Sequence, residues 1–346
     1  MILASELKKT REAWTISDMP PKDHEDVGPF FHNLFLLGEG DKDRLGLPDR
    51  WRYNHRMFRG DHWNENSRSK GQHPSKGKNA LNRLTMNLTF ANIQRTTANL
   101  TAKQPVVEAF EVGNERGQDD NTDKDLTAWL KKWWADTLQD DQLVDAATQM
   151  EIYGPAIDKA VLRGNRPDTV VVDPFAFGKC PGIFDSMQDA PYVYHIGVMR
   201  TDELESLYDL EPGTVEADDV YSTLGEDREE NNGPIPSGSV AGAVSNIDGS
   251  YASRGHRGAG DSNRIESRAL VVEVWARDYH GGDDGYPDNI RVVTITNNGN
   301  LVLADERNPN VNWAAYEKSP ELIENTYLYG RYPFTVVMSY RDKSSN

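Results

Sequence analysis

The hydrophobic pattern of this 346-residue chain changes its period at Gly154-Pro155, and this change restricts the folds open to it. Before this point apolar residues recur at spacings of three and four, the period of one helix face, in 86–100, 121–138 and 140–153. After it, short runs rich in Val, Ile, Thr and Tyr are typical of β-strands: 156–162, 169–172, 192–199, 270–276, 290–296, 301–305 and 333–340. The sequence therefore predicts an α+β fold, with a helical N-terminal half followed by a mostly antiparallel β region.

Local signals add detail to this outline. Asn298-Gly299, between the runs 290–296 and 301–305, is a strong hairpin signal. Residues 43–58 are predicted as a helix that ends at Gly60, with Leu45, Leu47, Trp51, Tyr53 and Phe58 as buried candidates. Pro105 is expected to stop the 86–100 helix, and 105–112 is β-like. Thr201 is expected to be the N-cap of a short helix reaching Tyr208.

The composition divides the chain into four parts. Residues 1–155 form the helical part, and 156–230 form a mixed strand and helix part that ends in an acidic segment. Residues 231–267 are rich in Gly, Ser and Asn and are predicted to be a mobile loop, because they bury too little apolar surface to offset their ordering entropy. Residues 268–346 form the final hairpin and strand part.

Total charge and cysteine content exclude several classes of protein. The formal net charge is −17, whereas a protein that grips DNA phosphates tightly shows a basic surface. This argues against a tight DNA-binding module, although it is compatible with a wall that DNA slides past. No run of about 18 apolar residues is present, so no membrane span is predicted. A single cysteine forms no internal disulfide, which fits a reducing compartment and leaves a disulfide-free secreted protein as the alternative.

The charge is unevenly distributed along the chain. Residues 52–83 are mostly basic and residues 201–230 are nearly all acidic. Two surfaces of opposite sign suit a head-to-side contact between copies, and ordinary solvated faces are the equally weighted alternative. The charged candidates for a subunit interface are Arg52, Arg56, Arg59, Asp202, Glu203 and Glu205.

The stretch 170–197 collects the residue types of reactive sites, namely Cys180, His195, Asp173, Asp185 and Asp189. A strand position for His195 and turn positions for the aspartates favour structural roles, since Asp in turns bonds local backbone N–H groups. The oxygen-rich stretch 278–289 lacks the alternation and terminal Glu of a calcium loop, so a plain turn is preferred over a metal site. We therefore predict no catalytic residue, no cofactor and no metal.

Three tryptophans lie close together in the predicted 121–138 helix: Trp129, Trp133 and Trp134. Base-stacking platforms normally accompany a basic groove, whereas acids flank this helix on both sides. The three tryptophans are therefore predicted to serve in the core or in a subunit interface.

Four stretches in this order resemble the N-terminal, wing part of portal proteins of tailed, podovirus-like bacteriophages. They are RWRYNHRMFRGDHW, NLTFANIQRTTANLTAKQPVVEAF, DAATQMEIYGPAIDKAVL and VVVDPFAFGKCPGIFDSMQDAPYVYHIGVMRTDELESLY. The resemblance covers roughly residues 45–208, and the later hairpin and the YPFTVVMSY strand are compatible with it. The resemblance rests on the order of the four motifs, because each motif alone is of low specificity.

The resemblance implies a structural protein. Portal subunits form a ring, usually dodecameric, at one vertex of the virion capsid, and double-stranded DNA is packaged and ejected through its channel. The implied partners are further copies of the chain, the major capsid protein, the terminase motor and tail-adaptor proteins, with no membrane and no enzymatic activity. Such a ring would be assembled in the host cytoplasm. Portal proteins continue into a stem helix and clip, and this chain ends at Asn346, where that helix is expected.

Two alternatives remain open from the sequence. Another head-tail connector or minor capsid protein would share the acidity and the lack of catalytic motifs. A metal-dependent nuclease or hydrolase would require acidic residues that come together only in the fold.

Overall fold

The computed structural model describes residues 19–60, 86–103, 105–109, 122–163, 166–218, 267–278, 290–309 and 331–338. The predicted loop 231–267 lies outside the described residues apart from Ser267. The helices are α2 (Val27–Arg44), α3 (Leu47–Arg59), α4 (Leu88–Leu100), α5 (Thr122–Asp136), α6 (Gln139–Tyr153) and α7 (Thr201–Leu207), with short 3-10 helices η3 (Pro174–Ala176), η4 (Met187–Asp189) and η5 (Asn297–Gly299). The strands are β1 (Pro155–Arg163), β2 (Arg166–Val172), β3 (Phe177–Lys179), β4 (Tyr192–Arg200), β5 (Arg268–Arg277), β6 (Ile290–Thr296), β7 (Leu301–Arg307) and β8 (Phe334–Met338).

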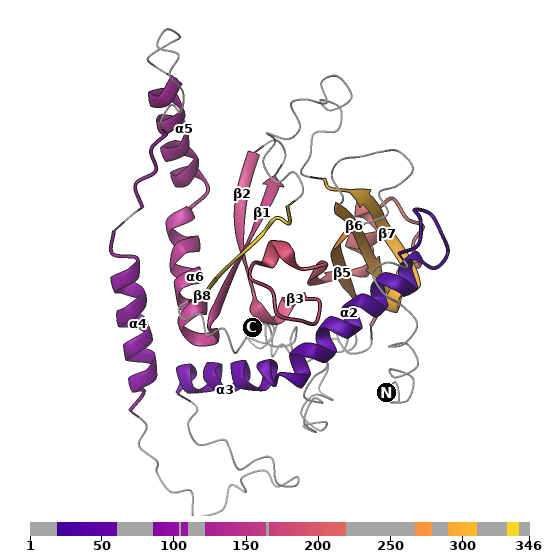
Figure 1. The fold of residues 1–346 in the computed structure, drawn as a ribbon, viewed down its shortest axis with the longest axis horizontal. Helices are drawn as coiled ribbons and strands as arrows, with labels where there is room; N and C mark the ends of the chain where they lie inside the picture. The colour runs from indigo at the N-terminus through magenta and orange to yellow at the C-terminus, as the bar shows by residue number, and fades with distance from the viewer. Residues whose placement is uncertain are drawn as a thin grey trace, which may run out of the picture.

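The protein has the predicted α+β fold. Two antiparallel sheets lie beside a layer formed by α4, α5 and α6, and α2 and α3 run along one side of the molecule (Figure 1). The change from helix to strand falls at Gly154, which caps α6 with a φ of 99° and is followed directly by β1. A positive φ of this size favours glycine, so the sequence signal and the backbone agree.

The sheets join segments that are far apart in the sequence. The three-stranded sheet has the order β2-β1-β8, and the five-stranded sheet has the order β3-β4-β5-β6-β7. β8 pairs with β1 from Pro155↔Met338 to Lys159↔Phe334. Every residue of β4 pairs with a residue of β5. The β6–β7 hairpin turns through η5, where Asn298 and Gly299 have positive φ, as predicted. The last part of the chain is therefore built into both sheets.

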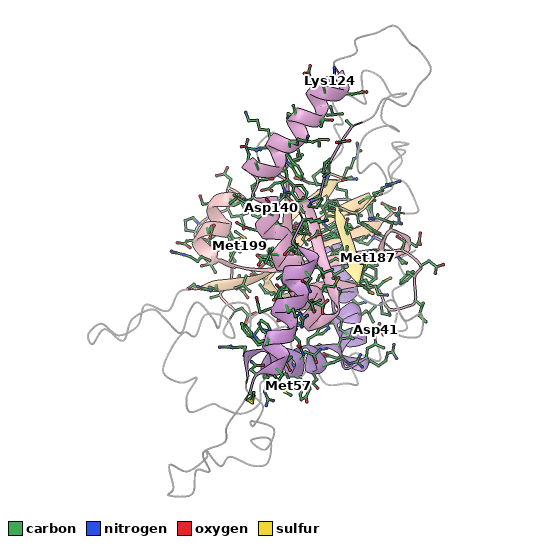
Figure 2. All side chains as sticks on the ribbon, turned by 90° about the vertical axis from the view of Figure 1, so that its left-hand side faces the viewer. Asp41, Met57, Lys124, Asp140, Met187 and Met199 are labelled. Carbon is green, nitrogen blue, oxygen red and sulfur yellow. The ribbon has the colours of Figure 1, made fainter. Side chains whose placement is uncertain are left out.

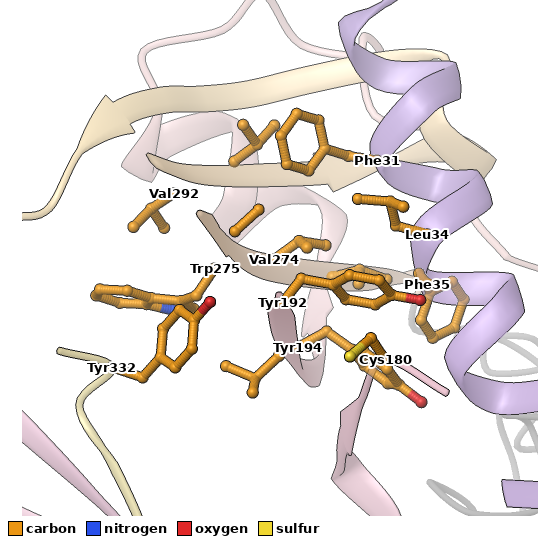
Figure 3. Close-up of a cluster of buried hydrophobic side chains, with 14 of the residues drawn as sticks. Phe31, Leu34, Phe35, Cys180, Tyr192, Tyr194, Val274, Trp275, Val292 and Tyr332 are labelled. Carbon is orange, nitrogen blue, oxygen red and sulfur yellow. The ribbon is translucent and has the colours of Figure 1, made fainter. Parts of the chain in front are cut away.

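Helix α2 packs on the five-stranded sheet and forms much of the core, although the sequence pattern did not predict it. Figure 3 shows Phe31, Leu34 and Phe35 pointing from α2 towards the strands. Three glycines within the helix, Gly28, Gly38 and Gly40, lower its intrinsic helix propensity, so the sequence pattern did not indicate it. At Gly38 the missing Cβ leaves room for the Tyr194 ring and for the carbonyl oxygen of Lys179. Tertiary packing therefore stabilises a helix that local propensity disfavours.

We predict opposite effects for two alanine substitutions in α2. A Cβ at Gly38 would lie 2.9 Å from the Lys179 oxygen and closer still to Tyr194, so Gly38→Ala is expected to destabilise the protein by about 1–3 kcal/mol. Gly40 is the control, because nothing lies within 4 Å of its ideal Cβ. Gly40→Ala is expected to stabilise by up to about 1 kcal/mol. Urea unfolding of both variants measures the difference, and equal stabilities would contradict the close approach.

The predicted 43–58 helix was wrong in extent. The chain breaks at Leu45-Gly46, where Gly46 has a φ of 65°, so α2 ends at Arg44 and α3 begins at Leu47. The predicted end is confirmed, since Gly60 caps α3 with a φ of 83°. Trp51 is buried as expected, whereas Leu45 and Tyr53 are exposed.

The helical layer also departs from prediction in its burial. α6 packs against α4 on one side and against β1 and β2 on the other. In α4 only Thr97 of the predicted stripe is buried, and Phe90 and Leu100 are about half exposed. Residues 105–109 form no strand, and Arg200 rather than Thr201 occupies the N-cap position of α7. The apolar spacing located the helices correctly, but it overestimated how many of their apolar side chains are buried within the chain.

Candidate subunit interface

The cysteine of the 170–197 stretch lies in the core. Cys180 is 4 % exposed and lies beside Tyr194 in Figure 3. Its backbone N–H donates to the Tyr192 carbonyl at 3.0 Å. Burial raises the pKa of the Cys180 thiol, and a protonated, enclosed thiol is a weak nucleophile. The position fits the structural role predicted for it.

Two aspartates of the same stretch, Asp173 and Asp189, stabilise turns. Asp173 accepts a hydrogen bond from the Phe175 N–H at 2.8 Å and so caps η3. Asp189 accepts from the Ser186 N–H at 3.0 Å, while the Ser186 hydroxyl oxygen accepts from the Gln188 N–H at 3.2 Å. Together these two bonds satisfy backbone donors at the start of η4. The turn residues are therefore engaged by the backbone.

A partly buried polar cluster links the two sheets, and sequence reasoning missed it. Lys159 on β1 donates to both Glu273 carboxylate oxygens on β5 at 2.7 and 2.8 Å. Trp275 donates to the same carboxylate, and His195 on β4 lies opposite Glu273 in the strand register. Lys159 and Glu273 are 114 positions apart, so no local spacing could have paired them. The Lys159 ammonium and the Glu273 carboxylate neutralise each other within this cluster.

His195 makes stability depend on pH. Burial, assisted by the Lys159 charge and opposed by Glu273, lowers the pKa of His195 to about 4. Between pH 6.5 and 4 the unfolded chain binds a proton that the folded protein does not, so stability falls as pH falls through this window. The loss amounts to roughly 3 kcal/mol at most.

The matched variant for this effect is His195→Gln, which does not titrate. Urea unfolding at pH 7, 5.5 and 4.5 is expected to show a shallower loss of stability for His195→Gln than for the wild type. Asp158 and Asp173, whose pKa values burial raises, contribute in the opposite direction in both proteins and cancel in the comparison. Parallel pH profiles would contradict the assignment.

The described residues were also compared with the requirements of a metal site and of a membrane-spanning helix. Among them, no three His, Cys, Asp or Glu side chains are grouped so that they could hold a metal ion. The stretch 278–289, weighed above as a calcium loop, lies outside the described residues except for Asp278. None of the helices in the described ranges is long and apolar enough to cross a bilayer.

An exposed apolar surface lies on α5, which projects from the body with Lys124 near its far end (Figure 2). Residues three and four apart share a helix face, and four large apolar residues follow this spacing. We call them the α5 stripe: Leu126, Trp129, Leu130 and Trp133. Leu126 is 46 % and Trp129 49 % exposed, whereas Leu130 and Trp133 are half-buried. The 105–109 segment contacts a different face, where the Ala109 N–H donates to the Thr127 hydroxyl at 3.0 Å.

The three predicted tryptophans have different environments. The Trp133 indole N–H donates to the Pro167 carbonyl at 2.6 Å, and that of Trp134 donates to Asp140 at 2.8 Å. These two residues therefore attach the base of α5 to β2 and to α6. Trp129, one turn further out, is the member of the group that remains available to a partner.

The charged interface candidates also differ in environment: some form contacts within the chain, and others are exposed. Arg52 pairs with Asp49 at 3.3 Å and lies over the Phe175 ring, whereas Arg59 is exposed. Arg56 is partly buried in the same helix. The predicted basic and acidic segments extend beyond the described residues into 61–83 and 219–230.

On the acidic side, Asp202 pairs with Arg200 at 2.5 Å, and Glu205 accepts from the backbone N–H groups of Gly213 and Val215 at 2.8 and 3.1 Å. Glu203 is exposed. The structure thus reduces the predicted set to fewer outward-facing charges.

Comparison of the sequence with models of known protein families gives no match, and no curated protein matches it. The resemblance to portal proteins therefore remains a prediction from the four sequence stretches. The candidate surfaces for a contact between copies are the α5 stripe and the exposed charged residues of α3 and α7.

Proposed function

We propose that this chain is the wing part of a portal subunit, which assembles with further copies into a dodecameric ring at one vertex of a bacteriophage capsid. Double-stranded DNA is packaged and ejected through the channel of this ring. The partners are the major capsid protein, the terminase motor and tail-adaptor proteins, and the chain performs no catalysis. The ring belongs to the virion and is assembled in the host cytoplasm.

The α5 stripe is the observation that supports this proposal most directly. A Trp and a Leu that are each about half exposed on a projecting helix leave apolar area in water, which favours burial against a partner. Aromatic residues of this kind dominate the energetics of protein interfaces. In a ring every copy offers the stripe to its neighbour, so one surface is covered in all copies by a single repeated contact.

The α+β arrangement agrees with a scaffold role. The two sheets and α2 enclose Cys180, and Asp173 and Asp189 bind turn backbone, while α4, α5 and α6 stand to one side and carry exposed apolar residues such as Leu88, Trp129 and Val144 (Figure 1). A rigid body with a lateral helical layer suits repeated side-to-side contact.

Electron microscopy of the purified full chain tests the proposal. Class averages viewed down the particle axis are expected to show a closed ring with a central hole wide enough for duplex DNA. Monomers at all concentrations would overturn the proposal, and rings of another symmetry or shell fragments would favour another virion component. Cleavage of plasmid DNA in the presence of magnesium or manganese would favour the nuclease alternative.

A further inference from the structure

The outward half of α3 carries an arginine-rich face. The helix contains four arginines and a single acid, Asp49. Arg50 and Arg59 are exposed, and Tyr53 lies between them with 44 % of its surface exposed. In a chain with a net charge of −17, a face with a local positive excess marks a contact for an acidic partner.

The acidic counterpart is formed by α7 and the turn that follows it. Residues 201–218 contain seven carboxylates and no lysine or arginine. Asp202 pairs with Arg200, and Glu205 binds the backbone N–H groups of Gly213 and Val215, so these two carboxylates already have partners within the chain. The outward-facing carboxylates are then Glu203, Asp209, Glu211 and Glu216. Leu207, which is 64 % exposed, lies among them as Tyr53 lies among the arginines.

These two faces belong to separate parts of one copy. α3 packs on α2, α4 and α6, whereas α7 packs on β4 and on a small core of Leu204, Val215, Ala269 and Val271. In Figure 2 Met57 of α3 and Met199, two residues before α7, lie well apart. A contact between the faces therefore joins two copies head to side, which is the geometry that closes a ring.

We propose that the arginine face of α3 docks on the acidic face of α7 in the adjacent copy, with Tyr53 and Leu207 as apolar contacts within the charged surface. This inference rests on the proposed ring and names the surfaces that form one of its contacts. Exposed ion pairs are individually weak and are screened by salt, but like charges at the same positions repel. The contact therefore selects the partner surface and sets its register.

Two charge-reversal variants of the full chain test the contact. The first carries Arg50→Glu and Arg59→Glu on α3, and the second carries Glu203→Lys and Glu211→Lys on the α7 face. Each alone places like charges opposite each other at every contact. We expect each to raise the subunit concentration for half assembly at least about tenfold in sedimentation at low salt. Raising sodium chloride to about 0.5 M is expected to weaken the wild-type assembly, because the Debye length falls to a few ångströms.

The decisive measurement is a one-to-one mixture of the two variants. An alternating arrangement places Glu against Lys at one contact and Arg against Glu at the next, so the mixture is expected to assemble where neither variant does. A charge pair within one copy would not be restored by mixing. A double variant Lys22→Glu/Lys103→Glu, which changes the net charge by the same amount as the α3 variant but at exposed sites elsewhere, is expected to assemble as the wild type does.

The outcomes separate this contact from the ring itself. A wild type that remains monomeric overturns the proposed function. A wild type that assembles, together with variants that assemble equally well or a mixture that stays dissociated, overturns the α3–α7 contact and leaves the ring standing.

Discussion

Glu273→Ala is expected to destabilise the fold by about 3 kcal/mol or more. Lys159 and Glu273 are only 14 % and 23 % exposed, and the Lys159 ammonium donates to both carboxylate oxygens. Burial alone would raise the pKa of the Glu273 carboxyl, but the Lys159 charge together with the hydrogen bonds from Lys159 and Trp275 holds this pKa below its ordinary value. Removing the carboxylate leaves a mostly enclosed ammonium between two sheets with no counter-charge from Glu273. Urea unfolding at pH 7 measures the loss.

Two controls separate this effect from a general cost of mutation. The double variant Lys159→Met/Glu273→Leu removes both charges and is expected to recover most of the stability, because a buried pair contributes little over an apolar replacement. Asp136→Ala breaks the exposed Asp136–Arg166 pair, which has an N–O distance of 3.0 Å, and is expected to cost under about 1 kcal/mol. A Glu273→Ala protein as stable as Asp136→Ala would show that the sheet-to-sheet pair is not needed.

Replacing the two exposed members of the α5 stripe is expected to have the largest effect on assembly. The variant Leu126→Ser/Trp129→Ser removes an aromatic anchor and its apolar neighbour from a helix that projects from the body (Figure 2). Loss of a central Trp from an interface commonly weakens binding on the order of 100-fold. Native mass spectrometry is expected to show monomers at concentrations at which the wild type forms rings.

The fold of this variant should be unchanged, since both side chains are about half exposed in one copy. Ile183→Ser is the matched control, because Ile183 is also exposed but lies in the turn between β3 and η4, away from α5. Rings formed equally by wild type and by Leu126→Ser/Trp129→Ser would exclude the α5 stripe from the interface. A lowered thermal midpoint would show instead that the stripe supports α5 within one copy.

Much of the fold could be predicted from the sequence where local physics dominates. Apolar spacing located α5 and α6, and runs rich in Val, Ile, Thr and Tyr located β4, β5 and β6, to within two residues. Glycines at positive φ defined the ends of α3 and α6 because other residues are strained there. The candidate interface was only partly predicted. The three tryptophans were predicted for the core or a subunit interface: Trp129 remains exposed on its helix, whereas Trp133 and Trp134 bond within the chain.

The sequence by itself therefore determined the α+β class, most elements and the main turns, because period, turn residues and charge act over a few neighbouring positions. Only the tertiary structure decided that α2 is a core helix, since its three glycines lower its helix propensity and Gly38 allows its close approach to Tyr194. Only the tertiary structure showed that Lys159 pairs with Glu273, and that Asp202 and Glu205 form contacts within the chain. Such contacts depend on how strands and turns meet in space, and no local pattern encodes a distance between residues more than a hundred positions apart.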